Sequence, residues 1–386
     1  MRALTRLRAA YSSRLRPAQR ARDLRLLPGD PAPAGTIRSL ADWVRDEGPS
    51  GSQLIELPRL GERRTRPAAQ TIQAEPHPKL EAIRNLPTDR RALVVAVLPG
   101  ARLATDLGLV VSPDNQIFAE TAWDEEQLAV SGVLRMRRLP RARRLPGTHA
   151  SLVSQWSDNY SHWLLEALPR TALLVEAGFG DPAFVVPWPL SRFQRDSLQL
   201  VGIDDDRLVP FARQHLEPEV LVWPAPPDHA GIPSSWTCRW LRERLAPPLG
   251  ERPPRPRRLY LSRSGIARPS KRRRVANEAD VLAVLKPLGF EVVRPEELSF
   301  AEQVRTFAGA EAVVAPHGAA LTNLVFSQRA RVLELFEETF VNPTYYCLAS
   351  SAGHDYWYLI GERAGRGDIR VPLDALRETL GRLLTD

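Results

Sequence analysis

The residue types best suited to acid–base chemistry in this 386-residue sequence are grouped around one histidine. Asp158, His162 and Glu166 follow one another at intervals of four residues, so in a helix their side chains would share one face. A histidine beside a carboxylate can act as an oriented general base, and Asp158 or Glu166 as the base, with His162 in a supporting role, is a competing assignment. A surface triad without a catalytic role is the alternative, and Asp158 is also a candidate N-cap of the helix.

A second group follows the apolar run at 311–315. The segment 316–323 reads PHGAALTN, in which a glycine and two small residues open a predicted short helix over 319–326. Exposed N–H groups and the positive end of the helix dipole would form an anion site there. An ordinary tight turn between a strand and a helix is the alternative. The candidate anion ligands are His317, Gly318, Ala319, Thr322 and Asn323.

A dense basic stretch follows another apolar run, at 258–262. Residues 251–274 contain ten basic residues and one acidic residue, a charge that could neutralise a pyrophosphate. A solvated loop is the alternative interpretation. The basic residues after the run are Arg263, Arg268, Lys271, Arg272, Arg273 and Arg274, of which Arg263, Arg273 and Arg274 are the candidate diphosphate ligands.

One carboxylate, Glu334, lies inside the apolar run at 331–336. A charge in a buried strand needs a partner. Glu334 is therefore either a ligand for ribose hydroxyls at the end of its strand or one half of a structural ion pair.

The sequence predicts neither a metal site nor a cofactor. The acidic run 204–206 reads as a turn, and no CxxC, HExxH, Walker loop or GxGxxG motif is present. Cys238 and Cys347 are the only cysteines, and we expect two buried, reduced thiols and not a disulfide.

The second half of the chain contains the elements that would position these residues. Five short apolar runs alternate with helical segments, which predicts a parallel sheet with helices on both faces. Ligands of such sheets bind at the carboxyl ends of the strands, where the candidate residues lie. The predicted strands are 258–262, 290–293, 311–315, 331–336 and 355–359, and the predicted helices are 278–288, 299–308, 319–326, 343–351 and 371–384.

The first half shows a similar alternation after an irregular, Pro-rich start over 28–90. The predicted strands there are 92–98, 107–111, 117–120, 151–154, 184–187 and 221–223, and the predicted helices are 164–177, 191–201 and 234–245. Five prolines in 246–256 indicate a linker. The sequence therefore divides into a basic arm (1–27), an N-terminal α/β domain (28–245), the linker (246–256), a C-terminal domain (257–365) and a last helix (366–386).

Charge is concentrated in the arm, which holds eight Arg and one Asp within a chain of net charge +8. The remaining residues are nearly neutral, which argues against a nucleic-acid-binding protein. The arm would bind an anionic membrane surface as an amphipathic helix or remain a solvated tail. No run of about 20 apolar residues predicts a membrane span, and Arg residues interrupt any signal-peptide core. We expect a cytoplasmic protein, with peripheral contact at the inner membrane face as the alternative.

Four segments, in this order, resemble glycosyltransferase family 61, whose bacterial members are often labelled capsular polysaccharide biosynthesis proteins. They are 158–166 (DNYSHWLLE), 260–263 with 273–278 (YLSR and RRVANE), 298–303 (LSFAEQ) and 316–323 (PHGAALTN). The family's Asn–His pair matches Asn159 and His162, its basic-loop Arg matches Arg263 and Arg274, and its His-Gly turn matches His317 and Gly318. Ala320 stands where Gly is common.

The resemblance implies a GT-B fold, with two Rossmann-like domains facing across a cleft and the nucleotide sugar held mainly by the C-terminal one. It also implies inverting transfer of a sugar from a UDP-linked donor to a glycan or polysaccharide acceptor, without an obligatory metal. Two other functions compete with this expectation: a catalytically silent carbohydrate- or nucleotide-binding protein on the same fold, and a nucleic-acid-binding protein that uses residues 1–27 and 251–274.

Overall fold

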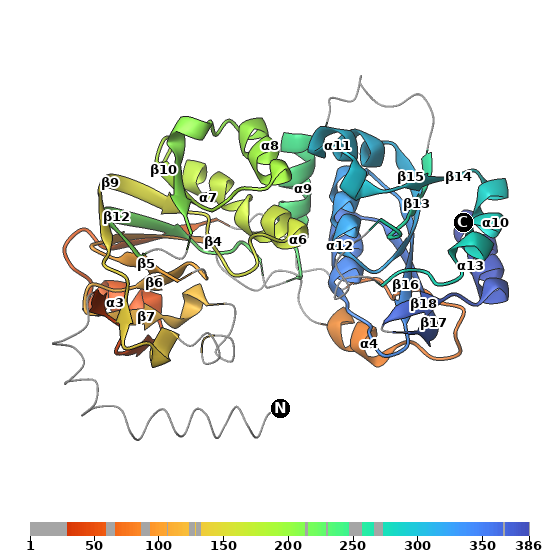
Figure 1. Ribbon diagram of the computed structural model, residues 1–386, viewed down its shortest axis with the longest axis horizontal. Helices are drawn as coiled ribbons and strands as arrows, with labels where there is room; N and C mark the ends of the chain where they lie inside the picture. Colours follow the sequence, from red (N-terminus) through yellow and green to blue (C-terminus); the bar gives the residue numbers. More distant parts are fainter. Residues whose placement is uncertain are drawn as a thin grey trace.

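The computed structural model shows two large sheets that lie beside one another, with helices between them (Figure 1). The structure describes residues 29–58, 66–85, 93–105, 107–122, 128, 133–212, 215–228, 231–246, 257–265, 273–365 and 367–385. The predicted arm and nearly all of the predicted linker lie outside these residues, as do Arg268, Lys271 and Arg272.

The N-terminal sheet joins ten of the described strands in the order β11-β10-β9-β12-β5-β6-β7-β2, with β4 on β12 and β3 on β4. Its strands are β2 (Gly35–Ile37), β3 (Gln53–Leu57), β4 (Leu93–Pro99), β5 (Arg102–Ala104), β6 (Leu109–Val111), β7 (Gln116–Phe118), β9 (Arg143–Ser151), β10 (Ala183–Pro187), β11 (Leu208–Phe211) and β12 (His215–Pro224). A separate pair of strands joins β1 (Asp30–Pro31) to β8 (Arg138–Leu139).

Only part of this sheet has the parallel order expected of a Rossmann-like domain. Strands β9 to β12 are mutually parallel, whereas β3, β4, β5, β6 and β7 pair with their neighbours antiparallel, apart from the parallel β2–β7 pair. Connection length explains part of this pattern. A parallel pair needs a crossover of a dozen or more residues, which the helices after β9 and β10 provide, whereas the short links between β5 and β6 and between β6 and β7 allow only antiparallel turns.

The helices of this half are α3 (Leu40–Asp46), α6 (Tyr160–His162), α7 (Arg170–Glu176), α8 (Arg192–Leu200) and α9 (Ser235–Leu245), with short 3-10 turns η1 (Ala119–Thr121), η2 (Val133–Arg135) and η4 (Asp205–Arg207). The single helix predicted over 164–177 is instead a π-helical turn, η3 (Trp163–Ala167), followed by α7. Pro169 lies at the junction, where its missing N–H would interrupt a continuous helix.

The C-terminal sheet has the predicted parallel strands in the order β14-β13-β15-β16-β17, and an additional strand, β18, adds antiparallel at the edge. The strands are β13 (Arg257–Leu261), β14 (Phe290–Val293), β15 (Ala310–Pro316), β16 (Arg331–Glu337), β17 (Asp355–Ala364) and β18 (Asp368–Arg370). The helices are α10 (Glu278–Leu285), η7 (Lys286–Leu288), η8 (Pro295–Glu297), α11 (Phe300–Ala308), η9 (Ala319–Phe326), α12 (Thr344–Ala352) and α13 (Leu373–Thr385).

Both faces of this sheet are covered by apolar side chains. In β15, Val313 and Ala315 pack with α11, η9 and α12, whereas Ala312 and Val314 pack with α10 and α13. This alternation follows from the two-residue period of a strand. The first cluster continues into the N-terminal half through residues such as Trp163 and Leu173, so the helices between the two sheets share one core.

Segment 66–85, which the sequence assigns to the N-terminal domain, packs on the C-terminal sheet. The Gln70 N–H donates to the Tyr356 carbonyl at 3.0 Å, and the Tyr358 N–H donates to the Gln70 carbonyl at 3.0 Å. Helix α4 (Pro78–Arg84) follows, and Figure 1 shows it beside β17. The predicted single unit over 28–245 is therefore wrong for this segment, because backbone pairing at a sheet edge can recruit a strand from anywhere in the chain.

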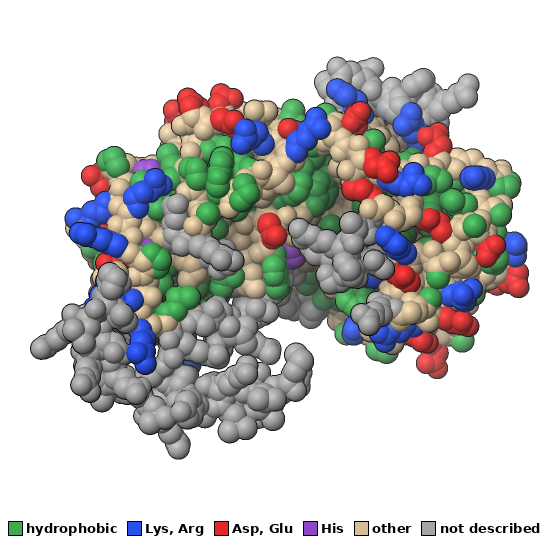
Figure 2. Space-filling model, in the orientation of Figure 1, with side chains coloured by type: hydrophobic (Ala, Val, Ile, Leu, Met, Phe, Trp, Pro, Cys, Tyr) green, Lys and Arg blue, Asp and Glu red, His purple; other side chains and the backbone are tan. Residues whose placement is uncertain are grey.

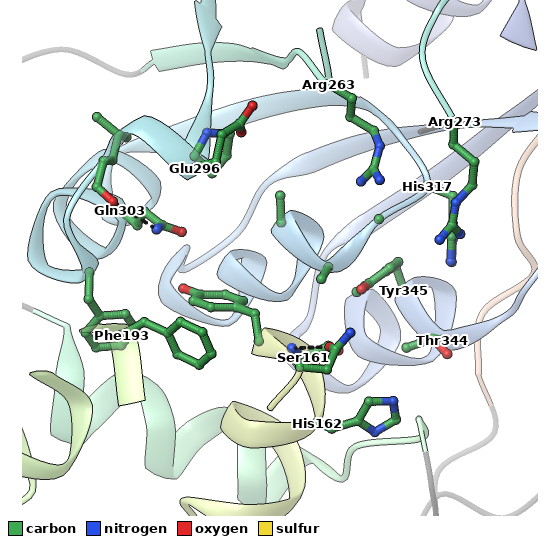
Figure 3. A pocket seen from close by; sticks show the side chains of 18 of the residues that line it. Ser161, His162, Phe193, Arg263, Arg273, Glu296, Gln303, His317, Thr344 and Tyr345 are labelled. Atoms are coloured by element: carbon green, nitrogen blue, oxygen red, sulfur yellow. Dashed lines mark hydrogen bonds between the residues drawn. The ribbon is translucent and has the colours of Figure 1, made fainter. Parts of the chain in front are cut away.

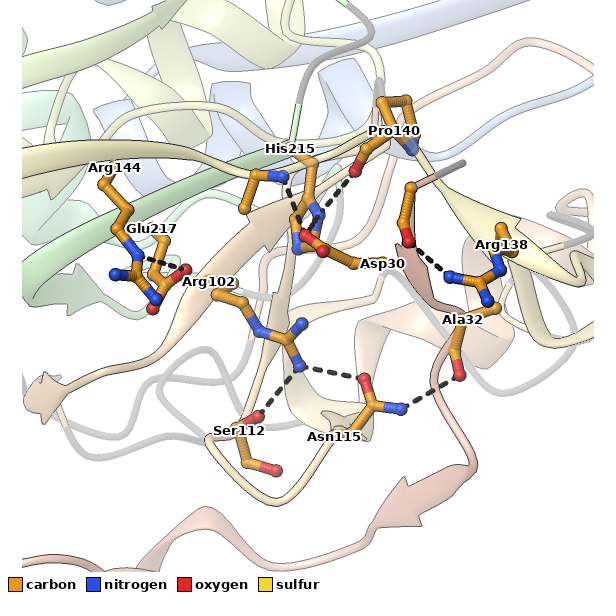
Figure 4. A network of polar contacts seen from close by, with 12 residues as sticks. Asp30, Ala32, Arg102, Ser112, Asn115, Arg138, Pro140, Arg144, His215 and Glu217 are labelled. Carbon is orange, nitrogen blue, oxygen red and sulfur yellow. Dashed lines mark hydrogen bonds and ion pairs between the residues drawn. The ribbon is translucent and has the colours of Figure 1, made fainter. Parts of the chain in front are cut away.

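The N-terminal end of the described chain is tied to its own sheet by a polar network (Figure 4). The Asp30 carboxylate accepts from the Ala142 N–H at 2.7 Å and lies 3.3 Å from His215 Nδ1. Asn115 links the Arg102 guanidinium to the Ala32 carbonyl, at 2.8 and 3.0 Å. The packed body therefore extends at least to residue 29.

Charged side chains are dispersed over the face shown in Figure 2. Lys and Arg there alternate with Asp and Glu, and they form no continuous basic surface among the described residues on that face. None of the helices in the described part of the chain is long and apolar enough to cross a membrane.

Candidate active site

A cavity of about 710 Å³ opens between the two halves of the molecule. Its N-terminal wall includes residues 158–162, Arg192 and Phe193, and its C-terminal wall includes Arg263, Arg273, 295–300 and 317–320. Figure 3 shows Arg263 and Arg273 entering from the C-terminal half and His162 from the N-terminal half. The sequence-predicted residues that line it are Asp158, His162, Arg263, Arg273, His317, Gly318 and Ala319.

His162 is positioned by the start of α6. The N-cap of this helix is Asn159, whose Oδ1 accepts from the Ser161 N–H at 2.9 Å. Asp158 precedes the helix and is exposed. Both predictions that place Asp158 within the helical face or at its N-cap are therefore wrong, because the asparagine next to it takes the capping position.

Glu166 holds the His162 ring, as the four-residue spacing predicts. The His162 Nδ1 lies 2.9 Å from Glu166 Oε1, and Glu166 is only 5% exposed. The same oxygen accepts from the Gly231 N–H at 3.3 Å. A carboxylate at Nδ1 favours the tautomer in which Nε2 carries the lone pair, the arrangement that a general base requires.

Arg170 packs next to the His162–Glu166 pair. Its Nε donates to the Glu166 carbonyl at 3.1 Å, and the side chain is buried. Burial lowers the pKa of Arg170 to about 10, while the Glu166 carboxylate acts in the opposite direction. Arg170 therefore remains cationic at neutral pH and lies next to the carboxylate that orients His162.

Arg263 follows β13 and lies against the turn after β15. The residue is 9% exposed, and its guanidinium fills the space that a side chain at position 318 would occupy. Burial, together with the nearby charge of Arg273, lowers the pKa of Arg263 to about 10. Two guanidinium groups that repel one another in a cavity would be stabilised by an anion between them.

Arg273 reaches the same cavity from the end of the basic stretch. Its guanidinium carbon lies 4.8 Å from the centroid of the Phe340 ring, a cation–π contact. Burial lowers the pKa of Arg273. Arg274 does not line the cavity. Its backbone N–H donates to Asp368 Oδ1 at 2.9 Å and its carbonyl accepts from the Ile369 N–H at 2.7 Å, so its backbone is tied to the β18 edge.

His317 is fixed by a second carboxylate. Its Nδ1 lies 2.6 Å from Glu334 Oε1, and the other Glu334 oxygen accepts from the Tyr356 hydroxyl at 2.5 Å. Glu334 is fully buried and does not line the cavity. The expectation that Glu334 binds ribose is therefore not met, and the alternative, a structural pair, is correct. The β15–β16 register explains it, because Ala315 lies opposite Glu334 and His317 follows two residues later.

Thr322 and Asn323 are fully buried within η9 and do not line the cavity. Asn323 accepts from the Tyr160 hydroxyl at 2.5 Å and donates to Gln303 at 2.9 Å. The predicted role of these two residues as anion ligands is wrong, because only the first turn of η9 faces the cavity. Asn323 instead links the helix that carries His162 to the C-terminal half.

Several lining residues escaped the sequence reasoning. Phe340 and Tyr345 surround the His317 ring, with centroid distances of 5.3 and 5.1 Å, and burial raises the pKa of Tyr345 to about 12. Both residues follow the carboxyl end of β16, so their position after a predicted strand could have indicated that they line the cavity. Other lining residues without a prediction are Ser161, Phe193, Glu296, Gln303 and Thr344.

Within the described ranges, no group of three or more His, Cys, Asp or Glu side chains is placed to hold a metal ion. Independence from metals stays a prediction. Cys238 and Cys347 are both buried and free, as expected.

An α/β protein with a histidine–carboxylate pair on one wall of a cavity and paired arginines on the other has the features of a group-transfer enzyme for an anionic donor. Residues 160–333 match the model of the family described as Glycosyltransferase 61. The match confirms the resemblance to that family and supports a glycosyltransferase. It contains His162, Arg263, Arg273 and His317. No curated protein matches the chain.

Proposed function

We propose that this protein is an inverting glycosyltransferase that moves a hexosyl or pentosyl group from a UDP-sugar to a hydroxyl of a glycan or polysaccharide. The observation that carries the proposal is that His162, held by Glu166, lines the same cavity as Arg263 and Arg273. Displacement at an anomeric carbon that bears a diphosphate requires a base for the acceptor and a cationic site for the leaving group.

On the donor side, Arg263 and Arg273 would bind the diphosphate. Ala319 and Ala320 begin η9 and line the cavity, and the N–H groups of a first helical turn lack partners within the helix. His317, whose Nδ1 is held by Glu334, lines the same end of the cavity and would bound the donor site beside the arginines. The proposal requires no metal, because these groups supply the positive charge.

On the acceptor side, His162 Nε2 would accept the proton of the attacking hydroxyl. The hydroxyl oxygen then forms a bond to the anomeric carbon from the face opposite the diphosphate. The bond from that carbon to the diphosphate oxygen breaks, and its electron pair leaves with the diphosphate, where the arginines stabilise the negative charge. Glu166 stabilises the imidazolium that results. The configuration at the anomeric carbon inverts.

The arrangement we propose is GT-B-like, with β9–β12 and their helices on the acceptor side and β13–β17 on the donor side. Its support is the parallel order of both strand groups and the position of the cavity between them. Segment 66–85 then belongs to the donor side.

A thermal-shift screen against nucleotides and nucleotide sugars tests the proposal. Binding to the native state raises the melting temperature, by the equivalent of about 2.7 kcal/mol at a ligand concentration of 100 Kd. We expect UDP and UDP-sugars to raise it and random-sequence DNA to produce no salt-sensitive gel shift. UDP binding without release of UDP from a UDP-sugar, across a panel of glycan acceptors, would favour the catalytically silent protein instead. If no nucleotide changes the melting temperature, the donor site is wrongly assigned.

A further inference from the structure

Trp156 is a large apolar side chain held at the edge of the cavity. It lies in the loop between β9 and α6 and is 41% exposed. Its ring centroid is 5.3 Å from that of His162, at an interplanar angle of 42°. It is not among the residues that line the cavity itself, whereas Asp158, two positions later, is. The indole therefore lies outside the reaction centre and next to the candidate base.

The backbone at this tryptophan is strained. Its φ is 60°, in the left-handed region that a bulky side chain rarely adopts. Strained residues of this kind persist only where the surroundings hold them, and they gather at functional sites. Here the Asn159 N–H donates to the Trp156 carbonyl at 2.8 Å, and buried Gln194 donates to the Ser157 carbonyl at 2.8 Å. The loop is thus tied both to α6 and to α8.

The side chains around Trp156 match the chemistry of a sugar ring. A pyranose has an apolar face of C–H groups and a rim of hydroxyls. An exposed indole offers an apolar surface with little conformational entropy to lose, and the exposed Asp158 carboxylate can accept hydrogen bonds from hydroxyls. Trp156 contacts the His162 ring and still leaves about two fifths of its surface accessible to a ligand.

We propose that Trp156 is the stacking platform for a neutral sugar residue of the acceptor, one unit away from the residue whose hydroxyl is deprotonated by His162. This inference rests on the proposed glycosyltransferase function and extends it. The acceptor is then an oligosaccharide or polysaccharide with at least two sugar units, and Trp156 determines how its chain enters the cavity.

The test measures binding of defined neutral hexasaccharides, namely xylohexaose, cellohexaose, mannohexaose and maltohexaose, to the full chain by microscale thermophoresis. We expect at least one to bind. Trp156→Ala should raise its Kd about tenfold, the size expected for one lost aromatic contact, and Trp156→Phe should raise it less. Trp188→Ala is the matched control, because Trp188 is 42% exposed, does not line this cavity and is not the tryptophan that contacts His162.

Two results would overturn the proposal: no binding of any hexasaccharide to the unmodified protein, or equal Kd values for the unmodified protein and Trp156→Ala. The melting temperature and its rise with UDP are measured for every variant. If UDP raises the melting temperature but no hexasaccharide binds, only the proposed role of Trp156 is wrong. If UDP does not raise the melting temperature of the unmodified protein, the proposed function itself is wrong.

Discussion

The guanidinium of Arg263 lies directly against the backbone of Gly318. A Cβ atom added at position 318 would be 1.8 Å from Arg263 Nη1. The φ of Gly318 is 171°, an extended value that any residue can adopt, so the glycine is required by this contact and not by the backbone conformation. The contact joins the strand end after β13 to the turn after β15.

Gly318→Ala should therefore weaken UDP binding without unfolding the protein. The clashing atom is the end of a flexible side chain, so Arg263 can move away, but it then leaves the proposed diphosphate site.

Arg263→Ala should cost about 1.5–3 kcal/mol of UDP binding, as expected for a charged hydrogen bond. Calorimetry measures both UDP affinities, with Arg258→Ala, in the preceding strand β13, as the control. Normal UDP affinity in a folded Arg263→Ala protein would contradict the donor site.

His162→Ala should lower kcat by about 10²–10⁴-fold, the contribution of a general base, with little change in UDP affinity. Glu166→Gln keeps the shape of the orienting group but not its charge, and an intermediate loss is expected. Asp158→Asn should have the smallest effect on kcat, because Asp158 lies outside the helix. Near-normal kcat in His162→Ala, together with an inactive carboxylate variant, would transfer the role of base to that carboxylate.

Activity should not depend on a divalent metal. Arg263 and Arg273 supply two positive charges at the proposed diphosphate site, which a metal would otherwise supply. The measurement is turnover after dialysis against EDTA, compared with turnover after addition of Mn²⁺ or Mg²⁺. Loss of activity in EDTA that either ion restores would show that the arginines are not sufficient.

Deletion of residues 1–27 should leave the fold and turnover on a soluble acceptor intact while reducing binding to anionic vesicles. The network around Asp30 begins after the deleted segment, and the arm carries most of the net charge of the chain. Vesicle co-sedimentation and the melting temperature are the two measurements. A truncated protein that fails to fold would mean that the arm packs on the body.

Stability should fall as the pH is lowered from about 6.5 to about 4. Burial lowers the pKa of His354 to about 4 from its ordinary value of 6.5, so within this window the unfolded chain binds a proton that the folded chain excludes. Its Nδ1 accepts from the Ala330 N–H at 3.1 Å, and its Nε2 lies 2.8 Å from the Leu324 carbonyl. Protonation of Nδ1 would remove the acceptor of the Ala330 N–H.

The loss from this one group amounts to about 3 kcal/mol once the pH is below both pKa values. Urea unfolding at pH 7 and at pH 4.5 measures most of this loss, because pH 4.5 lies just above the folded-state pKa. The glutamine in His354→Gln does not titrate, and its amide can still donate and accept hydrogen bonds. The free energy of unfolding should therefore differ less between the two pH values in this variant. An identical difference would assign the pH dependence to other groups, such as His215, whose pKa burial also lowers.

The C-terminal sheet could be predicted from the sequence because its signals are local. The capping box formed by Ser299 and Glu302 starts α11, and Gly289 adopts the left-handed conformation that ends the turn before β14. Each signal lies within a few residues of the feature that it determines.

The remaining features depend on contacts between distant residues. Gln70 joins β17 through backbone hydrogen bonds, which have no side-chain signature. Asn323 and Glu334 carry polar groups of the right chemistry, but whether such a group faces the cavity or the core depends on helix rotation and strand register. The cavity is therefore lined by His162 and Arg263, as the sequence predicted, but not by Asn323 and Glu334.

The path of segment 66–85 restricts how the molecule can move. The chain passes from the N-terminal half to the C-terminal half between 58 and 66, returns between 85 and 93, and passes again between 246 and 257. Two halves joined by one connection can rotate about it in any direction. Three connections restrict the rotation, because each of them limits how far the two halves can move apart. We therefore expect any opening of the cavity for donor exchange to be a small motion that keeps all three connections. A C-terminal fragment beginning at 257 would lack the segment whose Gln70 pairs with β17, so a fragment with these bounds leaves one edge of its own sheet uncovered.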